Sequence, residues 1–160
     1  MLKIDHMTVA YKNIPTVTDF SMDIKPGQII ALVGESGSGK TTVIRAVMGL
    51  LPAAGKVTGG DIVFDGKSLL NYTPEQWRTL RGSQISMIFQ DSGAMMNPTR
   101  RVGNVFVEYI RTHEKISKKA AWEKGIAMLE RMSLPDGERV MRSYPFQLSG
   151  GMRQRVGIAM

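Results

Sequence analysis

Apolar and polar side chains alternate along residues 2–11 and 17–24, the pattern of strands with one buried face. A turn at Lys25-Pro26-Gly27 follows. Residues 29–33 are then apolar without interruption, which is typical of a parallel strand buried on both faces. The pattern of residues 42–48 predicts a helix soon after this run. We therefore expect a pair of antiparallel strands that leads into a strand-loop-helix unit.

The middle of the chain continues with strands and helices. Residues 61–64 predict a strand that ends in a turn at Asp65-Gly66, and residues 73–76 have the capping-box pattern with proline at the first helical position. A second apolar run, at residues 85–89, predicts another buried strand. This order of elements is that of an α/β domain.

From residue 99 to residue 147 the pattern becomes helical. Four apolar residues spaced by four and three positions form one stripe: Trp122, Ile126, Leu129 and Met132. Core packing explains this stripe and the chain's methionines. We expect three parts: a core at residues 1–98, an inserted helical subdomain at 99–147, and a further motif with the start of its helix at 148–160.

The segment between the predicted strand and helix, residues 34–41, has the sequence G-x-x-x-x-G-K-T of a phosphate-binding loop, or Walker A motif. Glycine at 34, 37 and 39 permits positive φ and lets backbone N–H groups approach an anion. The helix N-terminus adds partial positive charge, Lys40 brings a full charge to the β- and γ-phosphates, and the Thr41 hydroxyl can bind Mg²⁺. The residues predicted to contact the nucleotide are Gly34, Glu35, Ser36, Gly37, Ser38, Gly39, Lys40, Thr41 and Thr42.

A second glycine-rich segment, Leu148-Ser149-Gly150-Gly151, precedes an expected helix that continues to Met160. The Ser149 hydroxyl can cap this helix, and the glycines leave its amides open to an anion such as a γ-phosphate. Between the two motifs, Gln90 ends the apolar run 85–89. Together these three features resemble the nucleotide-binding subunit of an ATP-binding cassette (ABC) transporter.

The resemblance implies an α/β P-loop NTPase fold with an antiparallel β part in front and an inserted helical subdomain. It implies ATP and Mg²⁺ as ligands, with Gln90 reaching the Mg²⁺ and the attacking water as a catalytic residue beside Lys40. Ser149-Gly150-Gly151 matches the signature motif, which closes over ATP bound to the opposite protomer of a head-to-tail dimer. Tyr11 matches an aromatic residue that stacks on adenine, and the alternative is an ordinary strand tyrosine.

Residues 87–91, Asn97-Pro98 and 144–155 resemble the ATPases of oligopeptide, dipeptide and nickel importers. That branch implies membrane permease subunits as partners, a second ABC ATPase protomer of the same or another kind, and, indirectly, an extracytoplasmic solute-binding protein. It places the chain at the cytoplasmic face of the membrane. Ser92 and the segment 93–96 differ from the residues usual in this branch, so the transported solute stays open.

The resemblance also implies a further apolar strand ending in Asp-Glu and then a switch histidine, and the sequence ends at Met160 before either. The aspartate of that strand holds Mg²⁺ and the glutamate polarises the attacking water. His6 and His113 both precede the signature motif and do not replace the switch histidine. We therefore expect ATP hydrolase activity from the complete protein, and none from these 160 residues alone.

Composition changes this picture little. The sequence has no cysteine, which excludes disulfides and thiolate metal sites. The net charge of +7 lies mostly in residues 99–160, which hold twelve basic and six acidic residues, against nine and eight in residues 1–98. Because closely spaced aromatic residues for base stacking are absent, we expect no nucleic-acid partner.

Two alternatives remain open. A soluble ABC ATPase that acts on nucleic acid or ribosomes shares both motifs, and a neighbouring permease gene distinguishes the importer from it. A P-loop GTPase or small-molecule kinase shares only residues 34–41. It does not explain Gln90 or the signature motif, and the sequence has no Asn-Lys-x-Asp guanine motif.

Overall fold

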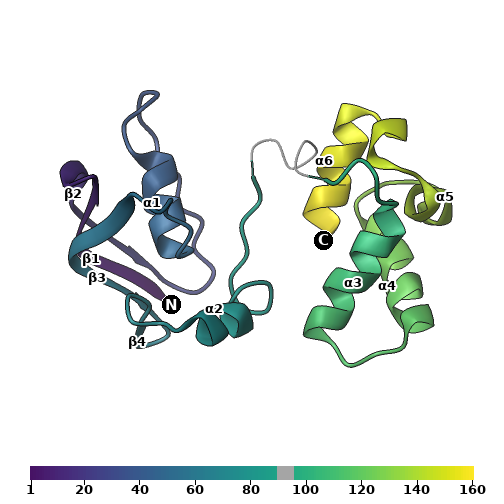
Figure 1. Ribbon diagram of the computed structural model, residues 1–160, viewed down its shortest axis with the longest axis horizontal. Coiled ribbons are helices and arrows are strands. Elements are labelled where there is room, and N and C mark those ends of the chain that lie inside the picture. Colours follow the sequence, from purple (N-terminus) through teal and green to yellow (C-terminus); the bar gives the residue numbers. More distant parts are fainter. Residues whose placement is uncertain (90–95) are drawn as a thin grey trace. The chain divides into compact units, whose positions relative to one another are not determined.

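The computed structural model describes residues 1–89 and 96–160 (Figure 1). The chain forms two units, Met1–Ser86 and Met87–Met160, each with its own hydrophobic core. The first unit contains a sheet and helices, and the described part of the second is helical.

The first unit is built on a four-stranded antiparallel sheet with the strand order β2-β1-β3-β4. β1 (Leu2–Tyr11) pairs with β2 (Ile14–Ile24) on one side and with β3 (Gly55–Phe64) on the other, and β4 (Lys67–Ser68) extends the sheet beyond β3. The pairing of β1 with β2 confirms the prediction from alternation. β3 begins earlier than predicted, because its first residues pair with the end of β1.

Neighbouring strands of this sheet have β-bulges where their register shifts. Three residues at these shifts have positive φ, with 47° at His6, 55° at Asp19 and 74° at Gly60. A Cβ on Gly60 would lie 2.3 Å from the carbonyl oxygens of Asp5 and His6, so only glycine fits there. The side chains of the two non-glycine residues meet, with His6 Nδ1 2.5 Å from Asp19 Oδ1.

The contact between His6 and Asp19 predicts a stability that depends on pH. The hydrogen bond of the His6 ring to the Asp19 carboxylate, then the charges of Asp19 and Asp5, raise the pKa of His6 above its ordinary value, while desolvation and the charge of Lys3 oppose them. Folding therefore favours protonated His6. This contribution is complete below the unfolded pKa of about 6.5 and is lost as the pH rises through the higher pKa of the folded chain.

We expect Asp19→Asn to lower the urea midpoint of the first unit more at about pH 5.5 than at about pH 8.5. Asparagine removes the charge but still tolerates the left-handed backbone, so the bulge is kept. Equal losses at both pH values would show that the charge on His6 contributes nothing to stability.

α1 (Lys40–Val47) follows the predicted phosphate loop and packs on the sheet. Its apolar face buries Val43, Ala46 and Val47, as the sequence pattern predicts. The first core consists of Ile4, Met7, Val9, Val43, Ala46, Val47, Ile62, Leu69 and Leu80. Each large side chain fully buried in it stabilises the unit by roughly 1.5–3 kcal/mol.

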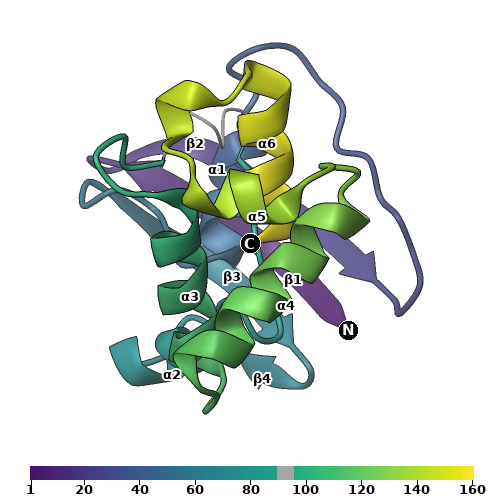
Figure 2. The same cartoon turned by 90° about the vertical axis from the view of Figure 1, so that its right-hand side faces the viewer.

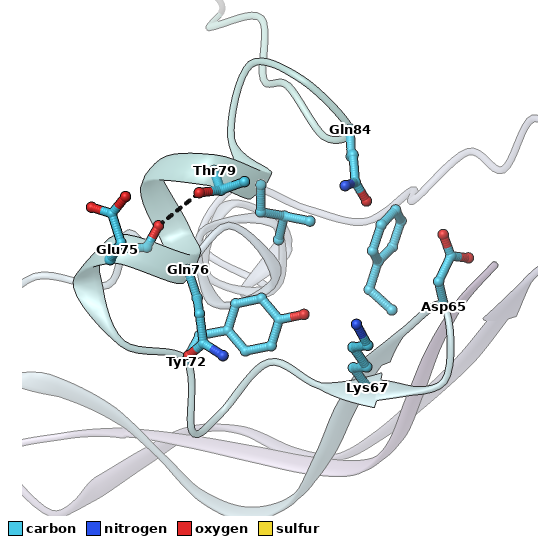
Figure 3. A pocket seen from close by; sticks show the side chains of 9 residues that line it. Asp65, Lys67, Tyr72, Glu75, Gln76, Thr79 and Gln84 are labelled. Carbon is cyan, nitrogen blue, oxygen red and sulfur yellow. Dashed lines mark hydrogen bonds between the residues drawn. The ribbon is translucent and has the colours of Figure 1, made fainter. Parts of the chain in front are cut away.

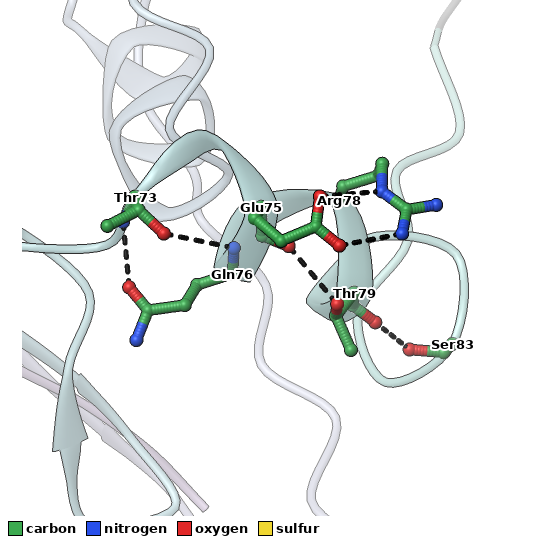
Figure 4. Close-up of polar contacts among 6 residues, drawn as sticks. All are labelled: Thr73, Glu75, Gln76, Arg78, Thr79 and Ser83. Carbon is green, nitrogen blue, oxygen red and sulfur yellow. Dashed lines mark hydrogen bonds and ion pairs between the residues drawn. The ribbon is translucent and has the colours of Figure 1, made fainter.

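α2 (Pro74–Leu80) begins with the predicted capping box (Figure 4). Thr73 Oγ1 accepts a hydrogen bond from the Gln76 N–H (3.3 Å), and Gln76 Oε1 accepts one from the Thr73 N–H (2.8 Å). Arg78, on the exposed side of this helix, forms an ion pair with Glu75 at 2.7 Å. The local pattern alone was enough to locate the start of α2.

Residues 29–33 and 85–89, which we predicted as buried strands, are not strands in the structure. The side chain of Ile29 is 100 % exposed, and those of Val33 and Ile88 are 88 % and 59 % exposed. A buried parallel strand takes its hydrogen bonds from neighbouring strands. Within residues 1–89 and 96–160 neither run has a strand partner, apart from an isolated bridge between Ile85 and Arg81.

The second unit contains four α-helices and a 3₁₀ turn among its described residues. They are α3 (Val102–His113), α4 (Lys118–Arg131), α5 (Gly137–Arg142), η1 (Pro145–Gln147) and α6 (Gly150–Ala159). α3 and α4 pack side by side (Figures 1 and 2). Helical structure predominates from residue 102 to residue 147, as the periodicity of this region predicts. No helix in the described part of the chain is both long enough and apolar enough to span a membrane.

The predicted apolar stripe of α4 faces the second core. Leu129 is fully buried, and Trp122, like Ile126 and Met132, packs against the core cluster. Gly103 of α3 lies close to the indole ring, since a Cβ there would be 2.4 Å from Trp122 Cζ3. The indole N–H donates to Glu138 of α5 at 2.8 Å. Three helices therefore meet at Trp122.

Candidate functional site

The predicted phosphate loop leads directly into α1. Gly37 and Gly39 have φ values of 85° and 90°, which non-glycine residues rarely adopt. Gly39 is the N-cap of α1, and no side chain of the described residues caps this end of the helix. The first amides of α1 are therefore available to a ligand, at the end of the helix that favours negative charge.

Gly34 differs from the other two loop glycines. Its φ lies outside the positive range, contrary to our expectation. A Cβ on Gly34 would lie 2.8 Å from Ser38 Oγ, closer than real Cβ atoms come to such a neighbour. The Ser38 hydroxyl therefore lies directly against the backbone of Gly34, and a side chain at position 34 would require that hydroxyl to move.

Lys40 lies with its ammonium group against the loop backbone. Its Nζ donates to the carbonyl oxygens of Gly34 (2.8 Å) and Glu35 (2.5 Å) and to Ser38 Oγ (3.2 Å). These contacts hold a full positive charge inside the glycine-rich segment, where the helix N-terminus adds its partial charge. The combination fits a phosphate chain, whose oxygens are stronger acceptors than neutral carbonyls.

The predicted Mg²⁺ ligands are only partly described. Thr41, in the first turn of α1, is exposed, so its hydroxyl is accessible beside the loop. Gln90, the other predicted ligand, lies outside the described residues. A single hydroxyl oxygen fits Mg²⁺, which usually keeps several waters and takes most of its other ligands from substrate phosphates.

Tyr11 lies at the end of β1 and is partly buried against the first core. Its ring packs over Gly55 of β3, since a Cβ on Gly55 would come within 2.6 Å of Tyr11 Cε1. This contact is enough to explain a tyrosine at the end of a strand. Stacking on adenine stays a prediction.

The signature segment forms the start of α6. Ser149 is the N-cap, and its Oγ accepts a hydrogen bond from the Met152 N–H at 3.3 Å, as predicted. Gly150 and Gly151 are exposed, and a Cβ on either would meet no atom within 4 Å. Packing in the described residues therefore does not require glycine at these positions. The segment belongs to the second unit and the phosphate loop to the first.

A cavity of about 330 Å³ lies elsewhere in the first unit, between the β3–β4 turn and α2 (Figure 3). Polar side chains of Lys67, Tyr72, Glu75 and Gln84 line it together with apolar ones. The cavity shares no residue with the phosphate loop, so it is not part of the candidate site.

Sequence reasoning missed one group of residues that acts on the far end of α1. Arg81 donates to the carbonyl oxygens of Met48 (2.9 Å) and Gly49 (2.8 Å) and lies over the ring of Trp77. The spacing of Trp77 and Arg81, four residues apart, and a glycine just after the helix were available signals. No signal in the sequence indicated that Arg81 would contact a segment thirty-three residues away.

Comparison with known families and proteins gives a consistent result. The family model described as ABC transporter matches residues 17–160. The chain is 39 % identical over 164 residues to the oligopeptide transport ATP-binding protein of Salmonella typhimurium and 41 % identical over 165 residues to the dipeptide transport ATP-binding protein of Bacillus subtilis. Both matches cover 100 % of this chain and 49 % of the relative. The chain thus spans about half the length of the curated relatives it matches.

Solved structures show the same fold. A dimeric bacterial ABC transporter cassette matches with a TM-score of 0.85 and 25 % identity, over 99 % of this chain and 68 % of that one. An ATP-binding cassette in a post-hydrolysis state, bound to ADP and Pi, matches with a TM-score of 0.82 and 24 % identity over the same shares. These matches confirm the predicted α/β fold class, and the predicted antiparallel β part is the sheet of the first unit.

Proposed function

Because the chain belongs to the ABC transporter family, within the branch of peptide importer ATPases, we propose that it is the ATP-binding subunit that drives peptide uptake. The observation that carries this proposal is the identity of about two residues in five, along the whole chain, to ATP-binding proteins of oligopeptide and dipeptide transport. The complete phosphate loop supplies the chemistry that such a subunit needs.

In this proposal the loop amides and Lys40 hold the β- and γ-phosphates of ATP. The Thr41 hydroxyl and Gln90 hold Mg²⁺, which when bound neutralises phosphate charge. Tyr11 stacks on the adenine. Glu35, Ser36 and Ser38 contribute backbone N–H groups to the loop, and Thr42 contributes the next amide of α1.

The signature segment acts on a second protomer. Ser149, Gly150 and Gly151 close over the nucleotide held by the phosphate loop of that protomer, so hydrolysis requires a dimer. The exposed glycines support this role, because a partner can approach the N-terminus of α6 without meeting a side chain.

In the same proposal the subunit works with membrane permease subunits at the cytoplasmic face of the membrane. Residues 1–98 form its nucleotide-binding core, and residues 99–147 form the helical subdomain inserted into that core.

Uptake measurements test the proposed solute. We expect deletion of the gene in its host to abolish uptake of a labelled dipeptide or tripeptide, because ATP binding drives the permease. A wild-type copy should restore uptake, and a Lys40→Ala copy should not. Uptake of radioactive nickel, measured in the same strains, is expected to stay unchanged. Loss of nickel uptake with normal peptide uptake would assign the other solute of this branch, and no change in either would contradict the proposal.

A further inference from the structure

The C-terminal end of α1 is closed by a Schellman motif. The Leu50 N–H donates to the Arg45 carbonyl (2.8 Å), and the Gly49 N–H donates to the Ala46 carbonyl (3.0 Å). Gly49 has a φ of 60°, the left-handed conformation that this motif requires. The next carbonyls, those of Met48 and Gly49, point beyond the helix and need other donors.

Arg81 supplies both donors. Its Nε donates to the Met48 carbonyl at 2.9 Å, and its Nη2 donates to the Gly49 carbonyl at 2.8 Å. The guanidinium charge thus lies at the negative end of the helix dipole, where a cation is stabilising. Two bonds from one planar group fix the direction of the helix end as well as its position.

Trp77 holds this guanidinium in place. The Arg81 Cζ lies 4.5 Å from the centre of the Trp77 ring, and Tyr72 packs edge-on against the same ring at 5.6 Å. A Cβ on Gly49 would lie 2.5 Å from Trp77 Cζ2 and 2.9 Å from Arg81 Nη2, so the glycine is required by space as well as by φ. Partial burial lowers the pKa of Arg81 from its ordinary value, which is consistent with a guanidinium drawn away from water.

We propose that Arg81 is a positioning residue for the phosphate loop, acting through α1 from its opposite end. The inference rests on the proposed ATP binding at that loop. α1 is a rigid rod of eight residues, roughly 12 Å long, whose first residue is Lys40. The N-terminal end of α1, which carries the phosphate loop, has no side-chain cap among the described residues. The clamp formed by Arg81, Trp77 and Gly49 anchors the opposite, C-terminal end of the same helix.

Nucleotide affinity of the full chain tests this role. We expect Arg81→Gln to weaken binding of a fluorescent ATP analogue roughly tenfold, because loss of the charge and of one or both bonds lets the helix end shift. Arg81→Lys, which keeps the charge but not the planar fork, should recover part of the affinity. The matched control is Arg78→Gln on the same helix, which removes only the exposed ion pair with Glu75 and should change affinity less than about twofold.

A second control separates positioning from stability. Leu69→Ala removes a buried side chain of the same core that is not a member of the clamp, and should lower the unfolding midpoint without changing affinity in the folded chain. Amide chemical shifts of Gly39 and Lys40 should move in Arg81→Lys and stay in place in Arg78→Gln. Equal affinity losses in Leu69→Ala and Arg81→Gln would overturn the positioning role, as would unchanged affinity in Arg81→Gln. Lys40→Ala keeps the two proposals apart, since unchanged binding in that variant contradicts ATP binding itself.

Discussion

Replacing Lys40 with alanine is expected to weaken ATP binding roughly ten- to a hundredfold, the largest effect of any single change in the phosphate loop. The ammonium group already contacts three acceptors of the loop, and bound phosphate oxygens replace neutral carbonyls as its partners. Removing it leaves the loop amides and the helix N-terminus as the remaining attraction. Titration with a fluorescent ATP analogue measures the loss directly.

Glu35→Ala is the matched control in the same loop. Glu35 contributes its backbone to the cradle and occupies a variable position of the motif, so affinity should change less than about twofold. Similar losses of affinity from Lys40→Ala and Glu35→Ala would argue that the loop does not bind phosphate.

The same titration applied to Tyr11→Ala tests adenine stacking. We expect Tyr11→Ala to lose about 1–3 kcal/mol of ATP-binding free energy, and Tyr11→Phe to retain most of the affinity.

Phe106→Ala is expected to destabilise the second unit by about 3–5 kcal/mol. Phe106 is 1 % exposed and lies in the core that joins α3, α4, α5 and α6, so truncation leaves a cavity that the surrounding helices fill only in part. Because the phosphate loop belongs to the first unit, ATP affinity should fall much less than stability.

The two tryptophans provide separate reporters for this experiment. Trp77 lies in the first unit and Trp122 in the second. In a Trp77→Phe background, urea unfolding followed by fluorescence reports on Trp122, and the midpoint should drop sharply with Phe106→Ala. In a Trp122→Phe background the midpoint reported by Trp77 should change little. Equal shifts of both midpoints would show that the two units unfold as one.

Local features of this chain were predictable from short stretches of sequence. The capping box of Thr73 and Gln76 and the N-cap of Ser149 depend on side chains that reach amides three residues away. The left-handed loop glycines at 37 and 39 follow from the conformational freedom of glycine itself. The family resemblance rests on such local motifs, and the matching families and folds confirm it.

Contacts between distant segments were decided only by the tertiary structure. The apolar runs at 29–33 and 85–89 are hydrophobic enough for buried strands, but a strand also needs neighbouring strands for its hydrogen bonds, and the described residues provide only an isolated bridge at Ile85. The clamp of Arg81 on Met48 and Gly49 joins residues more than thirty positions apart. The periodicity of apolar residues predicts which side chains are buried. Strand partners, strand register and close contacts between backbone segments depend on where the folded chain brings residues together that are far apart in the sequence.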